Sequence, residues 1–311
     1  MRLRFAMNSE FVYSWLVRLR TYAKQIDNRF ITEKVFINLA CVAADLSRLL
    51  PFRYSFVKMA SFWQTLKDKF NSASAAGGAV TVGYPLDMHS HLLPGIDDGI
   101  QDIDEALICL RQLADWGIRH VVTTPHISQD FHPNTSAHLR QAGQQVQALI
   151  ATHELPLTFT VAAEYLTDEL FDDRLQHDDL LSFGTERFVL IETGWAALPR
   201  QLPNWLFQMQ VKGYRPILAH PERYPYFRGK TAQLAGLKEQ GCSLQLNLMS
   251  LVGRYGDDAR RTARALIRAG LVDFVSSDLH RARDLAQLEK ALQSSDYQTA
   301  CQLPLTLPTF V

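Results

Sequence analysis

The segment Asp87–Gly99 places imidazole and carboxylate side chains at a spacing that suits metal binding. His89 and His91 stand one residue apart at the end of an apolar run, and the acidic pair Asp97 and Asp98 follows within seven residues of His91. In an extended backbone, residues i and i+2 share a face, so both imidazoles can reach the same ion. The pattern predicts a metal site where a strand turns into a loop, with Asp98 as a further ligand.

Six more imidazole or carboxylate side chains end later apolar runs: His126, Glu164, Glu192, His220, Asp278 and His280. In a parallel barrel the carboxyl ends of all strands point to the same rim, so side chains from distant segments meet there. Burying so many ionisable groups without a cation would be prohibitive. We therefore predict nine metal ligands: His89, His91, Asp98, His126, Glu164, Glu192, His220, Asp278 and His280.

The number of predicted ligands exceeds the about four to six that one ion takes, and fits two or three divalent ions such as Mn, Fe, Zn or Co. Clustered ions serve hydrolysis, because they lower the pKa of a bound water and clamp the oxygens of a phosphoryl group. Arg223 follows His220 by three residues, and a guanidinium there can grip phosphate oxygens in a bidentate way. Arg223 is therefore predicted as a catalytic and substrate-binding residue; the alternative is a salt bridge with Glu222 or a neighbour.

The other histidines are interpreted as surface or hydrogen-bonded core residues: His120, His132, His138, His153 and His177. The cysteines, Cys41, Cys109, Cys242 and Cys301, form no C-x-x-C pair, and none is followed by arginine at the sixth position after it. This spacing excludes a catalytic cysteine of the type that works with an arginine six residues later in the sequence. The lack of a disulfide framework favours a reducing, cytoplasmic location.

Strand-length apolar runs must position these side chains, and they alternate with segments of helical period such as 102–117. After the run that ends in His89 and His91, the expected strands are 120–126, 158–164, 187–193, 214–220, 243–248 and 273–280. Continuous apolar strands joined by helices favour a parallel sheet buried on both faces, in a (β/α) barrel or an open doubly wound sheet. No G-x-G-x-x-G follows any of these runs, which argues against dinucleotide binding.

The composition divides the chain of 311 residues into two parts. Residues 1–84 are expected to be an N-terminal extension and linker, disordered or helical, and residues 85–311 the metal-dependent domain. Residues 1–58 hold 10 of the 32 basic and 4 of the 32 acidic residues; they are interpreted as an extension or as sequence upstream of the true start at Met59. Zero net charge gives no case for nucleic acid. No apolar run reaches the roughly 18–20 residues of a membrane span.

Six segments, in this order, resemble a known family: DMHSHLLPGIDDG, TTPH, AAEY, LIET, LAHPERY and SSDLH. They are similar to the polymerase-and-histidinol-phosphatase (PHP) superfamily and, within it, to the bacterial protein-tyrosine phosphatases of the CpsB/CapC/YwqE type that regulate capsule and exopolysaccharide synthesis. The resemblance covers residues from about 85 to 293. It implies a distorted (β/α)7 TIM-like barrel, the PHP fold, with a trinuclear centre that most often holds manganese.

The resemblance also implies roles for the nine ligands. His89, His91, Glu164 and Asp278 would hold one ion; Glu164 would bridge to a second held with Glu192 and His220; Asp98, His126 and His280 would hold the third. Arg223 matches the phosphate-binding arginine of the family, and Arg283 is taken as a second substrate contact, although Arg281 is equally available. The implied reaction is in-line attack of a metal-held hydroxide on phosphotyrosine, with the tyrosine-rich tail of a bacterial polysaccharide-export kinase as the partner.

Three other functions fit parts of the same pattern. A small-molecule phosphoesterase such as histidinol phosphatase would share the metal ligands and differ in the shape of its pocket. A hydrolase of the amidohydrolase type also begins with H-x-H, but commonly uses a carboxylated lysine where this chain has Glu164 and Glu192. A metal-loaded scaffold without turnover would use the basic N-terminal region to attach to an export complex.

Overall fold

The structure, a computed structural model, describes residues 80–310. Residues 1–79 of the expected N-terminal extension and linker lie outside the described residues. A compact unit spans Ala79–Val311, and Val80 and Val82 already pack against its core. Within residues 80–310, no helix has both the length and the apolar character that crossing a bilayer requires.

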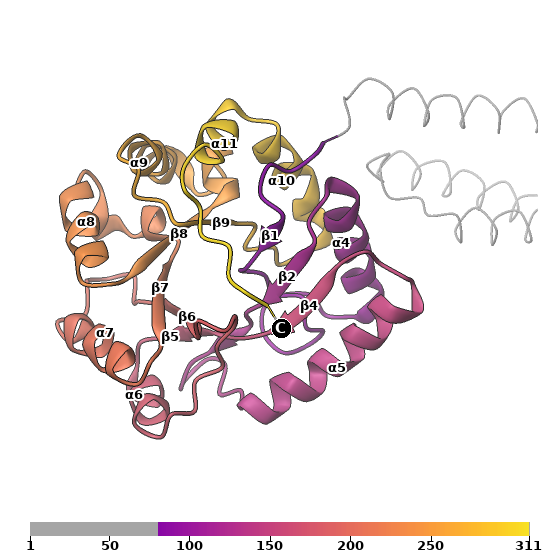
Figure 1. Cartoon of the computed structure of the whole chain (residues 1–311), viewed down its shortest axis with the longest axis horizontal. Helices are drawn as coiled ribbons and strands as arrows, with labels where there is room; N and C mark the ends of the chain where they lie inside the picture. Colours follow the sequence, from indigo (N-terminus) through magenta and orange to yellow (C-terminus); the bar gives the residue numbers. More distant parts are fainter. Residues whose placement is uncertain (1–79, 311) are drawn as a thin grey trace, which may run out of the picture. The chain divides into compact units, whose positions relative to one another are not determined.

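Strands alternate with helices along this unit, and the helices surround the strands (Figure 1). The strands are β1 (Leu86–Asp87), β2 (His120–Thr123), β3 (His126–Ile127), β4 (Thr158–Val161), β5 (Glu164–Leu166), β6 (Phe188–Glu192), β7 (Arg215–Ala219), β8 (Ser243–Asn247) and β9 (Phe274–Ser276). The α-helices are α4 (Ile103–Trp116), α5 (Ser136–Thr152), α6 (Glu169–Gln176), α7 (Leu202–Val211), α8 (Thr231–Glu239), α9 (Gly256–Arg268), α10 (Leu285–Leu292) and α11 (Ser295–Ala300). Short 3-10 helices are η1 (Pro221–Arg223), η2 (Pro225–Phe227), η3 (Leu248–Val252) and η4 (Ala282–Asp284).

All strand pairs in the described residues are parallel, which confirms the predicted α/β class. A three-stranded sheet has the order β1-β2-β4, and a six-stranded sheet has the order β3-β5-β6-β7-β8-β9. The strands β6, β7 and β8 consist almost wholly of buried residues. This burial is the reason that β6 and β7 are continuous apolar runs, whereas β8, with the sequence SLQLN, alternates polar and apolar residues although both of its faces are buried.

Two of the expected strands, 120–126 and 158–164, are each divided: the first half pairs in the three-stranded sheet and the end belongs to a strand of the six-stranded sheet. The run 120–126 contains β2 and the start of β3, separated by Thr124 and Pro125. Pro125 has no N–H to donate, so the regular ladder is interrupted at this point. Backbone hydrogen bonds nevertheless continue across the break, since Ala162 N donates to Thr123 O at 2.9 Å and Glu164 N donates to Pro125 O at 3.1 Å.

The segment after β1 lies beside the segment after β9. His91 N donates to Leu279 O at 2.9 Å, Asp278 N donates to His89 O at 2.8 Å, and Ser90 and Leu279 form a parallel bridge. These bonds place the polar residues that follow β1 next to the polar residues that follow β9. The pairing of the described residues shows two parallel sheets and does not by itself show a closed barrel of seven strands.

Helix α4 illustrates how local sequence sets the elements that frame the site. The Asp102 side chain caps its N-terminus by accepting from Glu105 N at 2.8 Å, and Gly117 ends it with a left-handed φ of 100°. Gly117 adopts this conformation without the Cβ clash that other residues meet. The buried face includes Leu110 and Leu113, as the helical period predicted.

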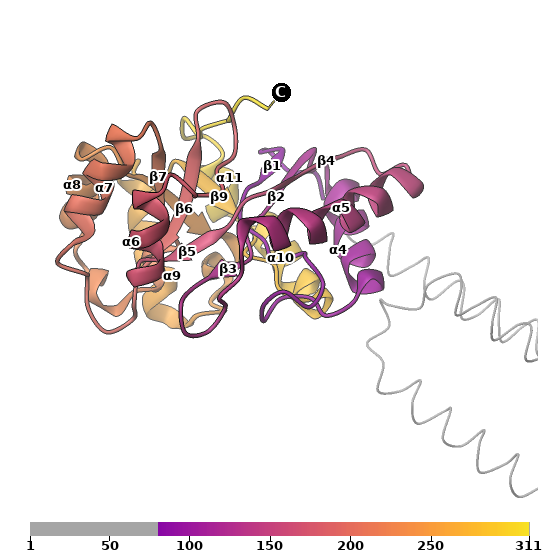
Figure 2. The ribbon, with the colours of Figure 1, turned by 90° about the horizontal axis from the view of Figure 1, so that it is seen from below.

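The C-terminal segment lies at the amino ends of the strands. Thr306 N donates to Asp273 O just before β9, and Thr185 N, just before β6, donates to Thr309 O. Figure 2 shows the C-terminus on one side of the strands and the connection after β3 on the other side. The carboxyl ends of the strands are therefore free of this segment.

Candidate metal centre and active site

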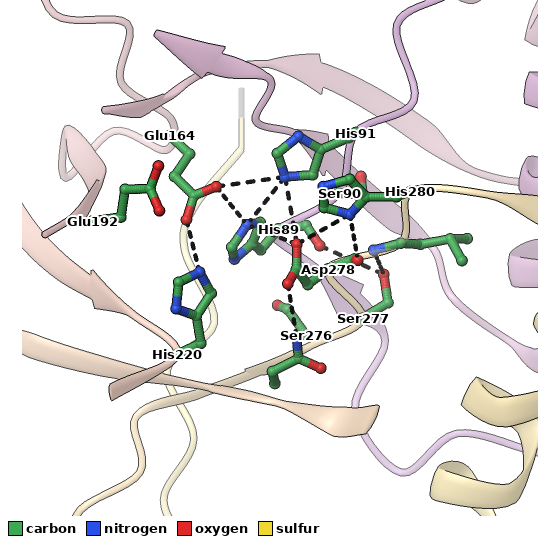
Figure 3. Close-up of polar contacts among 12 residues, drawn as sticks. His89, Ser90, His91, Glu164, Glu192, His220, Ser276, Ser277, Asp278 and His280 are labelled. Carbon is green, nitrogen blue, oxygen red and sulfur yellow. Dashed lines mark hydrogen bonds and ion pairs between the residues drawn. The ribbon is translucent and has the colours of Figure 1, made fainter. Parts of the chain in front are cut away.

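The nine predicted ligands lie close together beside the carboxyl ends of β1, β2, β4, β6, β7 and β9. Figure 3 labels His89, His91, Glu164, Glu192, His220, Asp278 and His280 among them. The ligating atoms of all nine form four groups, within each of which the atoms lie within 4.8 Å of one another. The groups are His91, Asp98, His126 and His280; His89, His91 and Asp278; His89, Glu164 and His220; and His126, Glu164 and Glu192. Because neighbouring groups share members, the arrangement fits several ions bridged by common ligands.

Glu164 lies at the centre of this arrangement and is fully buried. Its Oε2 lies 3.1 Å from His89 Nε2 and 3.2 Å from His126 Nδ1, and its Oε1 lies 3.0 Å from His220 Nε2. Burial opposes ionisation of Glu164, but the charges of His89 and His126 outweigh it and hold the pKa of the carboxyl well below its usual value. An ionised carboxylate that faces imidazoles on both oxygens is suited to bridge two cations.

Asp278 joins the metal ligands to the predicted phosphate-binding residue. Its Oδ1 lies 3.3 Å from His89 Nε2, while its Oδ2 accepts from Arg223 Nη1 at 2.7 Å and from Asn247 Nδ2 at 2.7 Å. Asp278 and His220 both adopt left-handed backbone conformations, with φ of 50° and 34°. Such conformations cost of order 1 kcal/mol or more in a non-glycine residue and cluster at functional sites.

A third set of predicted metal ligands, Asp98, His126 and His280, lies nearer the solvent. The Asp98 side chain is 64% exposed, and its Oδ1 lies 3.6 Å from His126 Nε2 and 3.5 Å from His280 Nε2. His280 Nδ1 lies 2.9 Å from Asp278 O, which can only accept a hydrogen bond. The proton of neutral His280 therefore sits on Nδ1, and the lone pair of Nε2 faces Asp98.

The hydrogen bonds of the buried imidazoles fit metal ions. His89 Nδ1 lies 3.0 Å from Gln245 Oε1 and His91 Nδ1 lies 2.7 Å from Asp97 Oδ2, so both rings direct their Nε2 lone pairs inward, where these nitrogens are 3.3 Å apart. His126 Nδ1 is buried and forms no hydrogen bond, although two carboxylate oxygens lie 3.2 Å away. Inward lone pairs next to carboxylates need a proton or a cation between them.

Asp97 is a residue that the sequence reasoning did not place in the site. It accepts from His91 Nδ1 and from His126 N, the latter at 2.9 Å. Burial disfavours the imidazolium of His91, but attraction to Asp97 and hydrogen bonds to Asp278 and Asp97 raise the pKa of His91 well above its usual value. A carboxylate behind a metal-binding imidazole fixes the ring's orientation and raises its basicity.

Gln245 and Asn247 were also missed, although the sequence carries a signal for them. They stand two residues apart in β8, whose sequence is SLQLN, so they share the face that points to the predicted ligands. Gln245 Oε1 lies near His89 Nδ1 and accepts from His220 N at 3.1 Å. Polar side chains that interrupt a buried strand at i and i+2 are therefore the pattern that predicts such supporting contacts.

A cavity of about 300 Å³ opens above these ligands. Its walls include Asp98, His126, Ser128, Phe131, His132, Glu164, Leu166, Glu192, Trp195, His220, Arg223, Asp278 and His280. His132, which the sequence analysis left out, lies with its ring 5.5 Å from that of His126 and nearly parallel to it. The structure thus places Arg223 and seven of the nine predicted ligands, all except His89 and His91, on the cavity wall.

Arg223 is held between two aromatic rings. Its guanidinium carbon lies 4.1 Å from the ring centre of Tyr255 and 5.2 Å from that of Trp195. Its ion pair is with Asp278, not with Glu222, the neighbour named in the salt-bridge alternative. Glu222 instead accepts from Ser250 Oγ at 2.7 Å and from Asn247 N at 3.1 Å. Arg223 is thus fixed beside the ligands and still lines the cavity.

The two candidates for a second substrate contact differ in their surroundings. Arg281 Nη2 donates to Asp98 O at 3.0 Å, and Arg281 Nη1 lies 3.8 Å from Glu105. Arg283 is exposed on η4 and forms no hydrogen bond or ion pair with any residue from 80 to 310. Neither arginine belongs to the cavity wall.

The contacts of Asp97 lead to a first testable prediction. Asp97→Asn is expected to lower the affinity for Mn²⁺ by about 10- to 100-fold, because a neutral amide orients and polarises His91 less well. Metal content after dialysis and a Mn²⁺ titration of activity measure the effect, with activity regained at high Mn²⁺. Asp104→Asn, at an exposed position in α4, is the matched control. Wild-type Mn²⁺ affinity in Asp97→Asn would contradict the prediction.

A parallel α/β fold with several groups of imidazole and carboxylate side chains that could hold metal ions is the arrangement of a metal-dependent enzyme. The family model described as "Capsular polysaccharide synthesis, CpsB/CapC" matches residues 85–297. The chain therefore belongs to the CpsB/CapC family.

Relatives of this chain have names that refer to one activity. It is 30% identical over 223 residues to the tyrosine-protein phosphatase YwqE of Bacillus subtilis (strain 168), a match that covers 71% of this chain and 88% of YwqE. It is 25% identical over 202 residues to the tyrosine-protein phosphatase CpsB of Streptococcus pneumoniae, covering 63% and 82% of the two chains. A chain from the crystal structures of YwqE and CpsB, described as unique metal-dependent tyrosine phosphatases, matches with a TM-score of 0.59 and 29% identity. That match covers 73% of this chain and 99% of the other.

Proposed function

We propose that this chain is a metal-dependent protein-tyrosine phosphatase. The observation that carries the proposal is the convergence of nine imidazole and carboxylate side chains, in groups that share ligands, on a cavity that Arg223 also lines. The names of the relatives YwqE and CpsB support the same activity. The substrate proposed is phosphotyrosine on a bacterial tyrosine kinase of capsular or exopolysaccharide synthesis, in the cytoplasm.

The finer architecture is part of the same proposal. The two parallel sheets together form a distorted (β/α)7 barrel, in which each divided strand passes from one sheet to the other. The centre would hold two or three divalent ions, with Mn²⁺ as the proposed metal and the ligand sets that the family resemblance implies. Arg283 is the proposed second substrate contact, because its guanidinium has no partner in residues 80–310 whereas Arg281 is bonded to the backbone of Asp98.

Divalent ions in this site supply an activated water nucleophile and neutralise charge on the transferring phosphoryl group. The protein's own groups orient the reactants. Arg223 presents a guanidinium whose second nitrogen is free to bind phosphate oxygens while the first holds Asp278. Asp97 and Gln245 fix His91 and His89, so the inward nitrogens keep their positions. Phenolate is a good leaving group, so the reaction needs no dedicated general acid.

Cysteine chemistry finds no support in the described residues. Cys109 and Cys242 are buried, and none of the described cysteines lines the cavity. Burial raises the pKa of the Cys242 thiol to about 12. A thiol with such a pKa supplies almost no thiolate at neutral pH.

The activity itself is the second prediction. The Mn²⁺-loaded protein is expected to hydrolyse phosphotyrosyl peptides, and EDTA is expected to abolish this activity because no protein nucleophile replaces the ions. Phosphate release measures turnover, with re-addition of Mn²⁺ as the control for damage by the chelator. Turnover that resists EDTA and is blocked by vanadate would contradict the proposal. A preference for histidinol phosphate over phosphotyrosyl peptides would favour the small-molecule alternative.

A further inference from the structure

Two exposed aromatic side chains stand at the metal cavity without an explanation so far. Among residues 80–310, the aromatic side chains that are exposed are Phe131, Trp195 and Phe207. Phe131 and Trp195 both line the cavity, and Phe207 lies away from it on α7. Exposed large apolar groups that border a cavity are typical of ligand binding.

Trp195 follows β6 closely, three residues after the predicted ligand Glu192. Its indole is parallel to the His220 ring, with an angle of 7° and centroids 6.2 Å apart. It also lies 5.1 Å from the ring of Tyr224 and 5.2 Å from the guanidinium of Arg223. The side chain is still 47% exposed. Trp195 is therefore anchored beside the metal ligands and the phosphate-binding arginine, with indole surface left over.

Phe131 belongs to the connection between β3 and α5, which lies on the side of the strands away from the C-terminus (Figure 2). The side chain is 75% exposed, and no aromatic or cationic partner of its ring occurs in the described residues. Exposure of the Phe131 ring to water is unfavourable, so binding of a ligand ring that covers Phe131 from the cavity side would be favoured.

We propose that Trp195 and Phe131 bind the aromatic ring of the substrate and select aryl phosphates over alkyl phosphates. The proposal rests on the proposed phosphatase function and adds to it the residues that recognise the leaving group. A phosphoryl group held by Arg223 and metal ions would leave its ester-linked ring inside the cavity that both side chains line. Aromatic rings gain from offset or edge contacts beyond the area that they bury.

Non-hydrolysable phosphonates test the proposal without the chemistry of the leaving group. Phenylphosphonate and methylphosphonate both present a phosphoryl group, and only the first carries a ring. Calorimetric titration of the Mn²⁺-loaded full chain is expected to show roughly 10-fold tighter binding of phenylphosphonate. Phe131→Ala is expected to remove most of this preference and to leave methylphosphonate binding unchanged. Trp195→Ala is expected to weaken phenylphosphonate binding much more than methylphosphonate binding. Trp195→Phe is expected to keep the preference in large part.

Phe207→Ala is the control, since it removes an exposed aromatic side chain outside the cavity. Equal affinity of the wild-type protein for both phosphonates, or a wild-type preference in the Trp195→Ala/Phe131→Ala double variant, would overturn the proposal. A parallel loss of both ligands in Trp195→Ala would also overturn it, because Trp195 would then act through Arg223. In each of these cases hydrolysis of phosphotyrosyl peptides would leave the proposed function standing. Tighter binding of phenylphosphonate without any hydrolysis of phosphotyrosyl peptides would instead contradict the proposed phosphatase function.

Discussion

Arg223→Ala is expected to lower kcat/KM for phosphotyrosyl peptides by about 100- to 1,000-fold, the effect of losing a fixed donor to the charge of the transition state. The metal content is expected to remain unchanged. Asp278 Oδ2 loses the bond from Arg223 Nη1, but Asn247 Nδ2 still donates to the same oxygen at 2.7 Å. The variant therefore separates phosphate binding from metal binding. Steady-state kinetics and metal analysis on the same sample measure the two effects.

Two further variants sharpen this result. Arg223→Lys keeps the positive charge but loses the planar fork and the stacking on Tyr255, so it is expected to restore little of the activity. Arg228→Ala is the control, because Arg228 is about half exposed and pairs with Asp258 on α9, away from the cavity wall. Wild-type turnover in Arg223→Ala would remove this residue from the mechanism. Loss of metal in Arg223→Ala would show that its main role is to hold Asp278.

The convergence of the predicted ligands could be read from the sequence, because all of them except Asp98 stand at the end of an apolar run and Asp98 follows in the loop after the first run. A parallel strand that is buried on both faces is usually a continuous apolar run in the sequence. The side chain that follows such a run lies at the carboxyl edge of the sheet. Each expected run contains a strand, and the polar ends of β6 and β7 lie where the pattern placed them, with Glu192 and His220. Convergence in space then follows from the parallel topology alone.

The supporting contacts were less accessible to sequence reasoning. Asp97 and Asp98 are adjacent and chemically identical, yet the exposed Asp98 lies beside His126 and His280 while the buried side of the loop places Asp97 against His91 Nδ1. The turn of the loop decides between these roles, and no spacing rule encodes it. The division of the run 120–126 at Pro125 was readable in principle, because proline cannot donate within a ladder.

The aromatic residues show a different limit. Tyr224 is fully buried and Trp195 is half exposed, although both lie near His220. The sequence shows that an aromatic residue stands close to a predicted metal ligand along the chain. Whether that aromatic side chain is exposed depends on how the following loop folds. The specificity of the pocket therefore becomes visible only when the cavity wall is known.

Glu164→Gln is expected to have the largest effect of any single substitution, with activity lowered by more than about 1,000-fold. Removing one partner of a buried charged set costs about 3–5 kcal/mol, and Glu164 faces four imidazoles within 3.5 Å, those of His89, His91, His126 and His220. A neutral amide leaves these rings without the charge that balances bound cations. Because Glu164 belongs to two of the four groups, Glu164→Gln is expected to lose more than one equivalent of metal.

Asp98→Asn provides the graded comparison for this result. Asp98 belongs to a single group and its side chain is 64% exposed, so water can replace much of its interaction with a cation. Its loss is expected to remove at most one equivalent of Mn²⁺ and to lower activity less than Glu164→Gln does. Glu239→Gln, at the exposed end of α8, controls for the chemical change alone. Metal analysis by mass spectrometry decides: equal metal content in Glu164→Gln and the wild-type protein would show that the buried carboxylate does not bridge ions.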